Sequence, residues 1–138
     1  LYRYLGKESY RELAEHGARY LAASTLLNQP RPLPGILLVD RELGEELTHI
    51  TIVGHKDSPE AATLHAAGRA FPALYKRIDW WDTREGPLPN PDVQYPELDQ
   101  PAAFACNNRI CSQPVLNPAD LAGTVTGMLA ARTANEIE

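Results

Sequence analysis

The hydrophobic pattern of the first 47 residues is that of helices. Apolar residues recur at helical spacing between Ser9 and Leu27, and the charged residues of this stretch lie away from the apolar stripe. Ser9 and Glu12 have the spacing of a capping box, so we predict that this helix starts there. Three prolines between positions 30 and 34 end it, and residues 35–43 predict a second, short helix that packs antiparallel on the first.

A β-branched run starts a different pattern at position 48. Residues 48–53, closed by Gly54, predict a buried strand. Ser58 followed by Pro59 has the chemistry of a helix start, and residues 75–81 predict a second strand after that helix. Two strands joined by a helix in this way lie parallel in one sheet. The expected inward face of the helix comprises Ala61, Leu64, Gly68 and Phe71.

The remaining residues predict a long loop, a hairpin and a last helix. Residues 83–101 hold five of the twelve prolines and little periodicity, which indicates a loop. Residues 102–106 and 110–115 flank an asparagine-rich turn and predict a β-hairpin. Asn117 and the proline after it are typical of a helix start. The expected inward residues of this last helix are Leu121, Ala122, Val125, Met128 and Leu129.

These elements together predict an α/β protein. Residues 1–47 form a helical segment, and residues 48–138 form a small mixed-sheet βαβ-β-hairpin-α domain. The order of elements in the second part is similar to a thioredoxin-like half without its active-site helix. Because a fold hosts many chemistries, this likeness by itself supports no activity.

The composition narrows the functional classes. The chain of 138 residues is 43% hydrophobic and carries a formal charge of −5, with its basic residues scattered, so we expect an ordinary globular protein with no nucleic-acid partner. It has no apolar run long enough to cross a bilayer and no signal-peptide pattern, so we expect no membrane association and a cytoplasmic location. Two cysteines are too few for a disulfide scaffold, although the sequence allows one redox-active pair.

Cys106 and Cys111 are the redox candidates, and three interpretations of this pair stay open. A four-residue hairpin loop would place them directly opposite each other, within range of a disulfide. A two-residue loop at Asn107 and Asn108 would instead place Cys106 opposite Arg109, with the sulfurs diagonal. In the third interpretation, each cysteine is an unpaired, small buried hydrophobe.

A binding site is expected at the carboxyl end of the first strand, with His55, Asp57 and Trp81 as candidates. Loops at that end of a parallel sheet are where α/β proteins usually bind small anions, but the competing interpretation is a polar connection that caps the helix. The adjacent Trp80 and Trp81 should face opposite sides of a strand, one in the core and one under the proline-rich loop, where it could stack on a sugar or base.

No catalytic, metal or cofactor motif is complete in this sequence. His16 and His49 have no acidic or sulfur neighbour at a spacing that would assemble a metal site. We find no serine–histidine–aspartate set, phosphate-binding loop or paired-carboxylate motif. We therefore expect no metal and no cofactor, and the sequence defines no reaction.

Three segments nevertheless resemble the ending of one protein family. They are residues 6–15, residues 50–54, and residues 105–115 with the Asn-Pro pair at 117–118. They are similar to the C-terminal region of the thioredoxin-domain-containing, spermatogenesis-associated proteins, which have an N-terminal thioredoxin-like domain followed by an (α/α) toroid like that of six-hairpin glycosidases. The resemblance implies that Cys106, Cys111 and Pro114 are motif positions, without assigning them a role.

The resemblance implies that this chain is the C-terminal part of a larger protein. Residues 1–47 would then be a remnant of the toroid, and the uncapped apolar stretch from Leu1 to Leu5 would be the end of a helix that needs upstream partners. We expect a non-catalytic accessory domain that binds upstream domains of its own protein. The alternatives are a thiol–disulfide module and part of a carbohydrate-processing enzyme whose active site lies upstream. An exposed helix face also predicts self-association of the isolated chain.

Overall fold

The computed structural model describes residues 1–23, 34–44, 48–73, 76–90, 93–107 and 110–135. The chain divides into two compact units: Leu1–Glu46 with Pro89–Val93, and Leu47–Leu88 with Gln94–Glu138. Helices make up the first unit, and a mixed sheet with helices makes up the second, so the predicted α/β class is confirmed. The assignment of residues 1–47 to a toroid remnant and of residues 48–138 to a separate small domain stays a prediction.

The first unit contains three described helices, and two of its sequence predictions need correction. Helices α1 (Tyr2–Leu5) and α2 (Glu8–Leu21) meet at Gly6, which has a left-handed φ of 68°. The predicted capping box at Ser9 is wrong: Lys7 occupies the extended cap position, and Glu8 already lies in the first turn, where a carboxylate is favourable. Helix α2 ends at Leu21, before the predicted Leu27, and residues 24–33 lie outside the described part of the chain.

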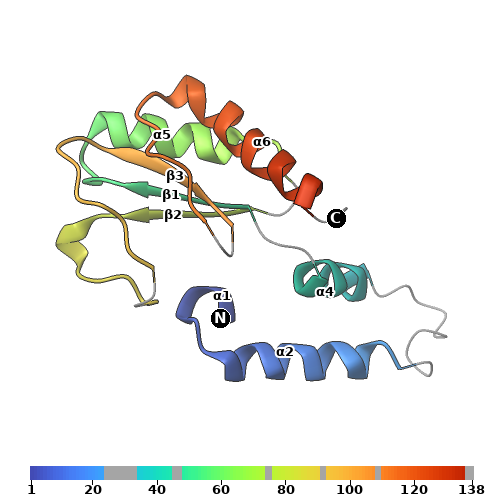
Figure 1. The fold of residues 1–138 in the computed structure, drawn as a ribbon. Coiled ribbons are helices and arrows are strands. Elements are labelled where there is room, and N and C mark those ends of the chain that lie inside the picture. The colour runs from blue at the N-terminus through green and yellow to red at the C-terminus, as the bar shows by residue number, and fades with distance from the viewer. Residues whose placement is uncertain (24–33, 45–47, 74–75, 91–92, 108–109, 136–138) are drawn as a thin grey trace. The chain divides into compact units, whose positions relative to one another are not determined.

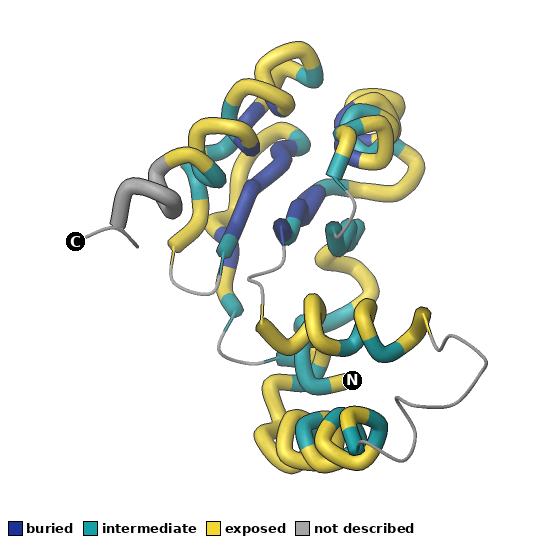
Figure 2. The backbone as a smooth tube through the Cα atoms, turned by 90° about the vertical axis from the view of Figure 1, so that its right-hand side faces the viewer, coloured by how far each residue is buried: buried dark blue, intermediate teal, exposed yellow. Residues whose placement is uncertain are grey.

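The predicted second helix exists as α4 (Pro34–Gly44), but its direction was predicted wrongly. Pro34 stands in its first turn, where a missing N–H costs nothing. Helix α4 packs beside α2 and crosses it steeply, instead of running antiparallel (Figures 1 and 2). A hydrogen bond of 2.7 Å from the Arg3 guanidinium to the Glu42 carbonyl connects α1 with α4.

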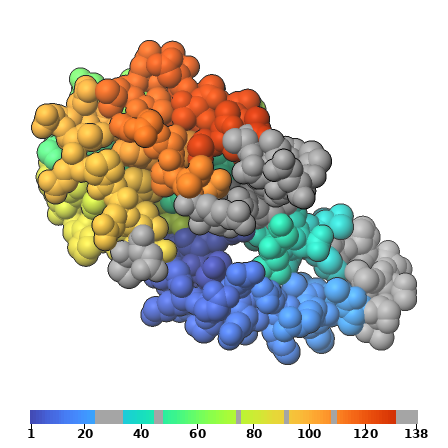
Figure 3. Space-filling model, viewed as in Figure 1, coloured from blue at the N-terminus to red at the C-terminus, as the bar shows by residue number. Residues whose placement is uncertain are grey.

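The apolar faces of these helices are open to solvent. No residue of α1, α2 or α4 is buried, and Leu13, Tyr20 and Leu37 are 67%, 68% and 73% exposed. Figure 2 shows the exposure along the tube, and the side chains of α2 lie at the surface along the helix in Figure 3. As the pattern predicts, the stripe of α2 is not enclosed by the described part of its own chain.

The second unit is built on a three-stranded sheet. Strands β1 (Thr48–Val53) and β2 (Lys76–Trp81) are parallel, with helix α5 (Pro59–Ala70) between them in sequence, which confirms the predicted βαβ unit. Strand β3 (Ala102–Cys106) pairs antiparallel with β1, so the strand order is β2-β1-β3. β1 is therefore the central strand, which agrees with its strong apolar and β-branched content.

The core lies between one face of this sheet and helices α5 and α6 (Pro118–Asn135), which cover the same face (Figure 1). Ser58 caps α5 by accepting a hydrogen bond from the Ala61 N–H at 3.2 Å, as predicted. The predicted inward position of Ala122 on α6 is wrong, because this side chain is exposed. The buried core residues are Ile50, Ile52, Ala61, Leu64, Ala103, Ala105, Val115, Leu121 and Val125.

The predicted hairpin is present, but its second arm is not a regular strand. Ser112 donates a backbone hydrogen bond to Ala105, and Ala103 and Val115 exchange two, all at 2.8 Å. This register leaves Gln113 and Pro114 opposite a single residue, which is a β-bulge. Pro114 has no N–H to donate to a ladder, which explains why regular pairing stops there.

Candidate functional site

Cys106 and Cys111 form a disulfide across the hairpin. The two residues are bridge partners, as the four-residue loop predicts, with an S–S distance of 2.00 Å and a Cα–Cα distance of 4.0 Å. The interpretation of each cysteine as an unpaired hydrophobe is therefore wrong, and neither cysteine is free. The diagonal arrangement with Cys106 opposite Arg109 is also wrong, because the bridge pairs Cys106 with Cys111; Asn108 and Arg109 lie outside the described residues.

The two sulfurs have different surroundings. Cys106 is only 8% exposed, whereas Cys111 is exposed. Because side chains alternate along β3, Cys106 lies on the sheet face opposite helices α5 and α6. On that face the buried Tyr95, from the proline-rich loop, packs its ring on Phe104 at 5.1 Å and places its hydroxyl 3.9 Å from the Cys106 sulfur.

A row of polar side chains extends from Tyr95 across the sheet. The Tyr95 hydroxyl donates a hydrogen bond of 2.7 Å to the Thr51 hydroxyl, and this hydroxyl lies 3.1 Å from His49 Nε2. His49 Nε2 is in turn 2.7 Å from an Asp79 carboxylate oxygen on β2. Burial raises the pKa of Tyr95 above its ordinary value of about 10, so its hydroxyl is a protonated donor at neutral pH.

The sequence did not indicate this row. His49 has no acidic neighbour along the chain, but parallel pairing places Thr51 directly opposite Asp79 and so brings the carboxylate to His49. Tyr95 has no local signal at all, because it stands in a loop without periodicity. Among the described residues, no group of three or more potential ligands could hold a metal ion.

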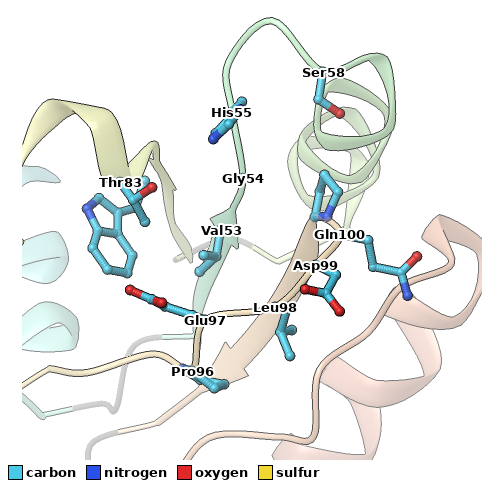
Figure 4. A pocket seen from close by; sticks show the side chains of 12 residues that line it. Val53, Gly54, His55, Ser58, Thr83, Pro96, Glu97, Leu98, Asp99 and Gln100 are labelled. Carbon is cyan, nitrogen blue, oxygen red and sulfur yellow. The ribbon is translucent and has the colours of Figure 1, made fainter.

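A pocket of about 420 Å³ lies at the carboxyl ends of β1 and β2. His55 and Trp81 line the same pocket, whereas the third binding candidate, Asp57, does not. Figure 4 shows His55 coming from the loop after β1, Ser58 from the start of α5, and the loop before β3 closing the other side. The lining residues are Val53, Gly54, His55, Ser58, Trp81, Thr83, Pro96, Glu97, Leu98, Asp99, Gln100 and Pro101.

Asp57 instead belongs to a group of ion pairs beside the pocket. Arg84 donates two hydrogen bonds to Asp57, at 3.2 and 3.0 Å, and also binds Asp82. Asp82 is only 3% exposed and accepts a 2.9 Å hydrogen bond from the Lys56 N–H. The Arg84 hydrogen bond holds the pKa of Asp82 well below its usual range. These contacts connect the β1–α5 loop, through Asp57 and Lys56, to the short 3₁₀ turn at Thr83–Glu85.

The two tryptophans face opposite sides of β2, as predicted. Trp80 packs against the core and lies 4.8 Å from the ring of His65, while its indole N–H donates to the Gly54 carbonyl at 3.0 Å. Burial lowers the pKa of His65, so this ring is neutral at pH 7. Trp81 lines the pocket and donates to the Gly86 carbonyl at 2.9 Å. Both indoles are therefore held by backbone hydrogen bonds.

The fold and the site place the chain in the α/β class of proteins. The second unit, where described, has a mixed α/β fold with a three-stranded sheet and one disulfide across its hairpin. Comparisons with protein-family models, curated proteins and solved structures find no match to this chain. Within the described ranges, no helix has both the length and the apolar character needed to cross a membrane.

Proposed function

We propose that this chain is a non-catalytic accessory region of a larger protein with a thioredoxin-like domain and an (α/α) toroid. The supporting observation is the exposed apolar stripe of α2, with Leu13 and Tyr20 both more than half exposed. A helix of this pattern normally buries that stripe against another element. In an (α/α) toroid, that element is a neighbouring helix, so the proposed partner is an upstream helix of the same protein. The resemblance of residues 6–15, 50–54 and 105–115 to the C-terminal region of that family supports the same partner.

The second unit, in contrast to the first, buries apolar side chains within its own fold. Its sheet and two helices enclose a core of their own, with Ile50 and Ile52 fully buried. We therefore propose that the helical unit attaches the chain to its partner and that the α/β unit is the stable scaffold. The ion pairs around Asp82 and Arg84 support a scaffold role, because they connect loops to each other.

The isolated chain is expected to self-associate through the open helices. Light scattering on the wild-type chain should detect dimers or larger species, and the double substitution of Leu13→Gln and Leu37→Gln should shift it to a monomer, because apolar patches without a partner pair with one another. The matched control is Leu98→Gln, an exposed leucine of the second unit, which should leave the wild-type distribution unchanged. A monodisperse wild-type monomer would contradict the proposal.

A second candidate function is a thiol–disulfide module that uses Cys106 and Cys111. The observation that favours it is the disulfide itself, with one exposed cysteine. A disulfide in a reducing compartment is usually transient and redox-active, so the proposed cytoplasmic location strengthens this candidate. A carbohydrate-processing activity would belong to the upstream region, and it stays a prediction.

A redox titration tests the second candidate. The wild-type chain is equilibrated in glutathione buffers poised between about −180 and −300 mV and then alkylated, and the number of modified cysteines is read by mass spectrometry. A redox module is expected to change from disulfide to dithiol within this range. A pair that stays fully oxidised at the most reducing poise is a structural disulfide, and this result would exclude the redox function.

A further inference from the structure

Access differs between the two sulfurs of the disulfide. An external thiolate breaks a disulfide by attacking one of its sulfurs, so the attacked atom must be reachable from solvent. Cys111 is exposed, whereas Cys106 is 8% exposed and lies beside the buried hydroxyl of Tyr95. Attack at Cys106 would have to reach the sulfur of a buried residue, whereas attack at Cys111 starts from an exposed residue.

The leaving group also differs between the two directions of attack. Exchange is faster when the departing sulfur is the more stable thiolate. If Cys111 is attacked, the electron pair of the broken bond goes to the Cys106 sulfur, which is 3.9 Å from a protonated phenol. The hydroxyl hydrogen of Tyr95 can turn from Thr51 to this thiolate, and the Thr51 hydroxyl can then donate to the Tyr95 oxygen. A hydrogen bond to an anion is stronger than one between neutral groups.

The geometry points to Cys111 as the site that forms a mixed disulfide with small external thiols, with Cys106 as the leaving thiolate and Tyr95 as its hydrogen-bond donor. This inference rests on the thiol–disulfide candidate above. In the first step, the external sulfur bonds to the Cys111 sulfur, and the Cys106–Cys111 bond breaks. A second external thiolate then attacks the external sulfur, which releases the oxidised small thiol and leaves both cysteines reduced. Two thiols thus supply the two electrons.

The site of attack can be read directly. The oxidised wild-type chain is treated with reduced glutathione for a short time, quenched with acid and alkylated, and the peptides are separated by mass. We expect glutathione on Cys111 and the alkyl group on Cys106 in most singly exchanged molecules. Glutathione predominantly on Cys106 would overturn the inference while leaving the redox candidate intact. A disulfide that glutathione does not open at any poise would overturn both.

The role of Tyr95 has its own test. Tyr95→Phe keeps the ring on Phe104 and removes the hydroxyl, so the rate of mixed-disulfide formation is expected to fall about tenfold, which corresponds to one hydrogen bond to an anion. In the Cys111→Ser background, the same change should raise the pKa of the Cys106 thiol, measured by thiolate absorbance. Tyr20→Phe, at an exposed tyrosine of the first unit, is the control and should change neither quantity. An unchanged rate and pKa in Tyr95→Phe would exclude the assigned donor.

Discussion

Replacing Leu121 with alanine is expected to lower the free energy of unfolding of the α/β unit by about 3 kcal/mol, in the middle of the range for buried leucines. Leu121 is 1% exposed and belongs to the core that α6 shares with the sheet. Its removal takes apolar atoms out of the core and leaves a cavity, because the sheet below and α5 beside it limit how far the neighbours can close in. Urea denaturation followed by tryptophan fluorescence measures this, since both tryptophans lie in β2.

Leu116→Ala is the matched control for this substitution. It makes the same chemical change near the start of the same helix, but Leu116 is 47% exposed. Its effect is expected to stay within about 1 kcal/mol, because nearly half of the surface of Leu116 already contacts water. Equal losses for the two variants would mean that α6 does not pack on the sheet as described.

The second large effect is expected at Gly54, where alanine should lower the free energy of unfolding by about 2 kcal/mol or more. A Cβ placed on Gly54 would lie 2.8 Å from the Pro101 Cβ and 3.2 Å from its Cα, so the loop before β3 would have to move. The φ of Gly54 is also positive, at 156°, a conformation that alanine adopts only with strain. The same denaturation experiment reports the change.

Gly127→Ala should instead raise the free energy of unfolding. Gly127 lies in helix α6, and a Cβ there would meet no atom within 4 Å. Alanine is favoured over glycine in a helix interior, so the free energy of unfolding of this variant is expected to rise by up to about 1 kcal/mol.

If Gly54→Ala were as stable as the wild-type chain, the close contact between Gly54 and Pro101 would be wrong. Because Gly54 and Pro101 both line the pocket, its shape depends on this contact.

Local chemistry was sufficient to predict most elements of the α/β unit. Ser58 followed by Pro59 specifies the start of α5 through a side-chain cap and a residue that lacks an N–H. The β-branched run of β1 specifies a central strand, because such side chains pack well on a pleated surface. Both signals act within a few residues, which is why they can be read along the chain.

The errors occurred where the outcome depended on distant residues or on weak local preferences. The start of α2 was misplaced because the helix continues past the serine that could cap it to Glu8, whose carboxylate is favourable in the first turn. The direction of α4 was wrong because short helices have several ways to pack and a periodic pattern does not choose between them. The second hairpin arm was read as a strand, although Pro114 removes the donor that a regular ladder needs.

The site was predicted only in part, for the same reason. Cys106 and Cys111 are five positions apart, so the sequence could limit their pairing to a few registers, and tertiary structure chose one. His55 and Trp81 could be placed at one edge of the sheet because parallel strands end together. Tyr95 could not be placed, since a loop without periodicity carries no information about the face on which it folds back.

The amino-acid order therefore determines the α/β class, the main elements and the proximity of the two cysteines, because capping, β-branching and hairpin turns are short-range interactions. Only the tertiary structure decides that a loop tyrosine, a strand threonine and a histidine line up beside the buried sulfur of Cys106. Their contacts join residues up to 44 positions apart, and such contacts form only when the sheet register and the loop are both in place.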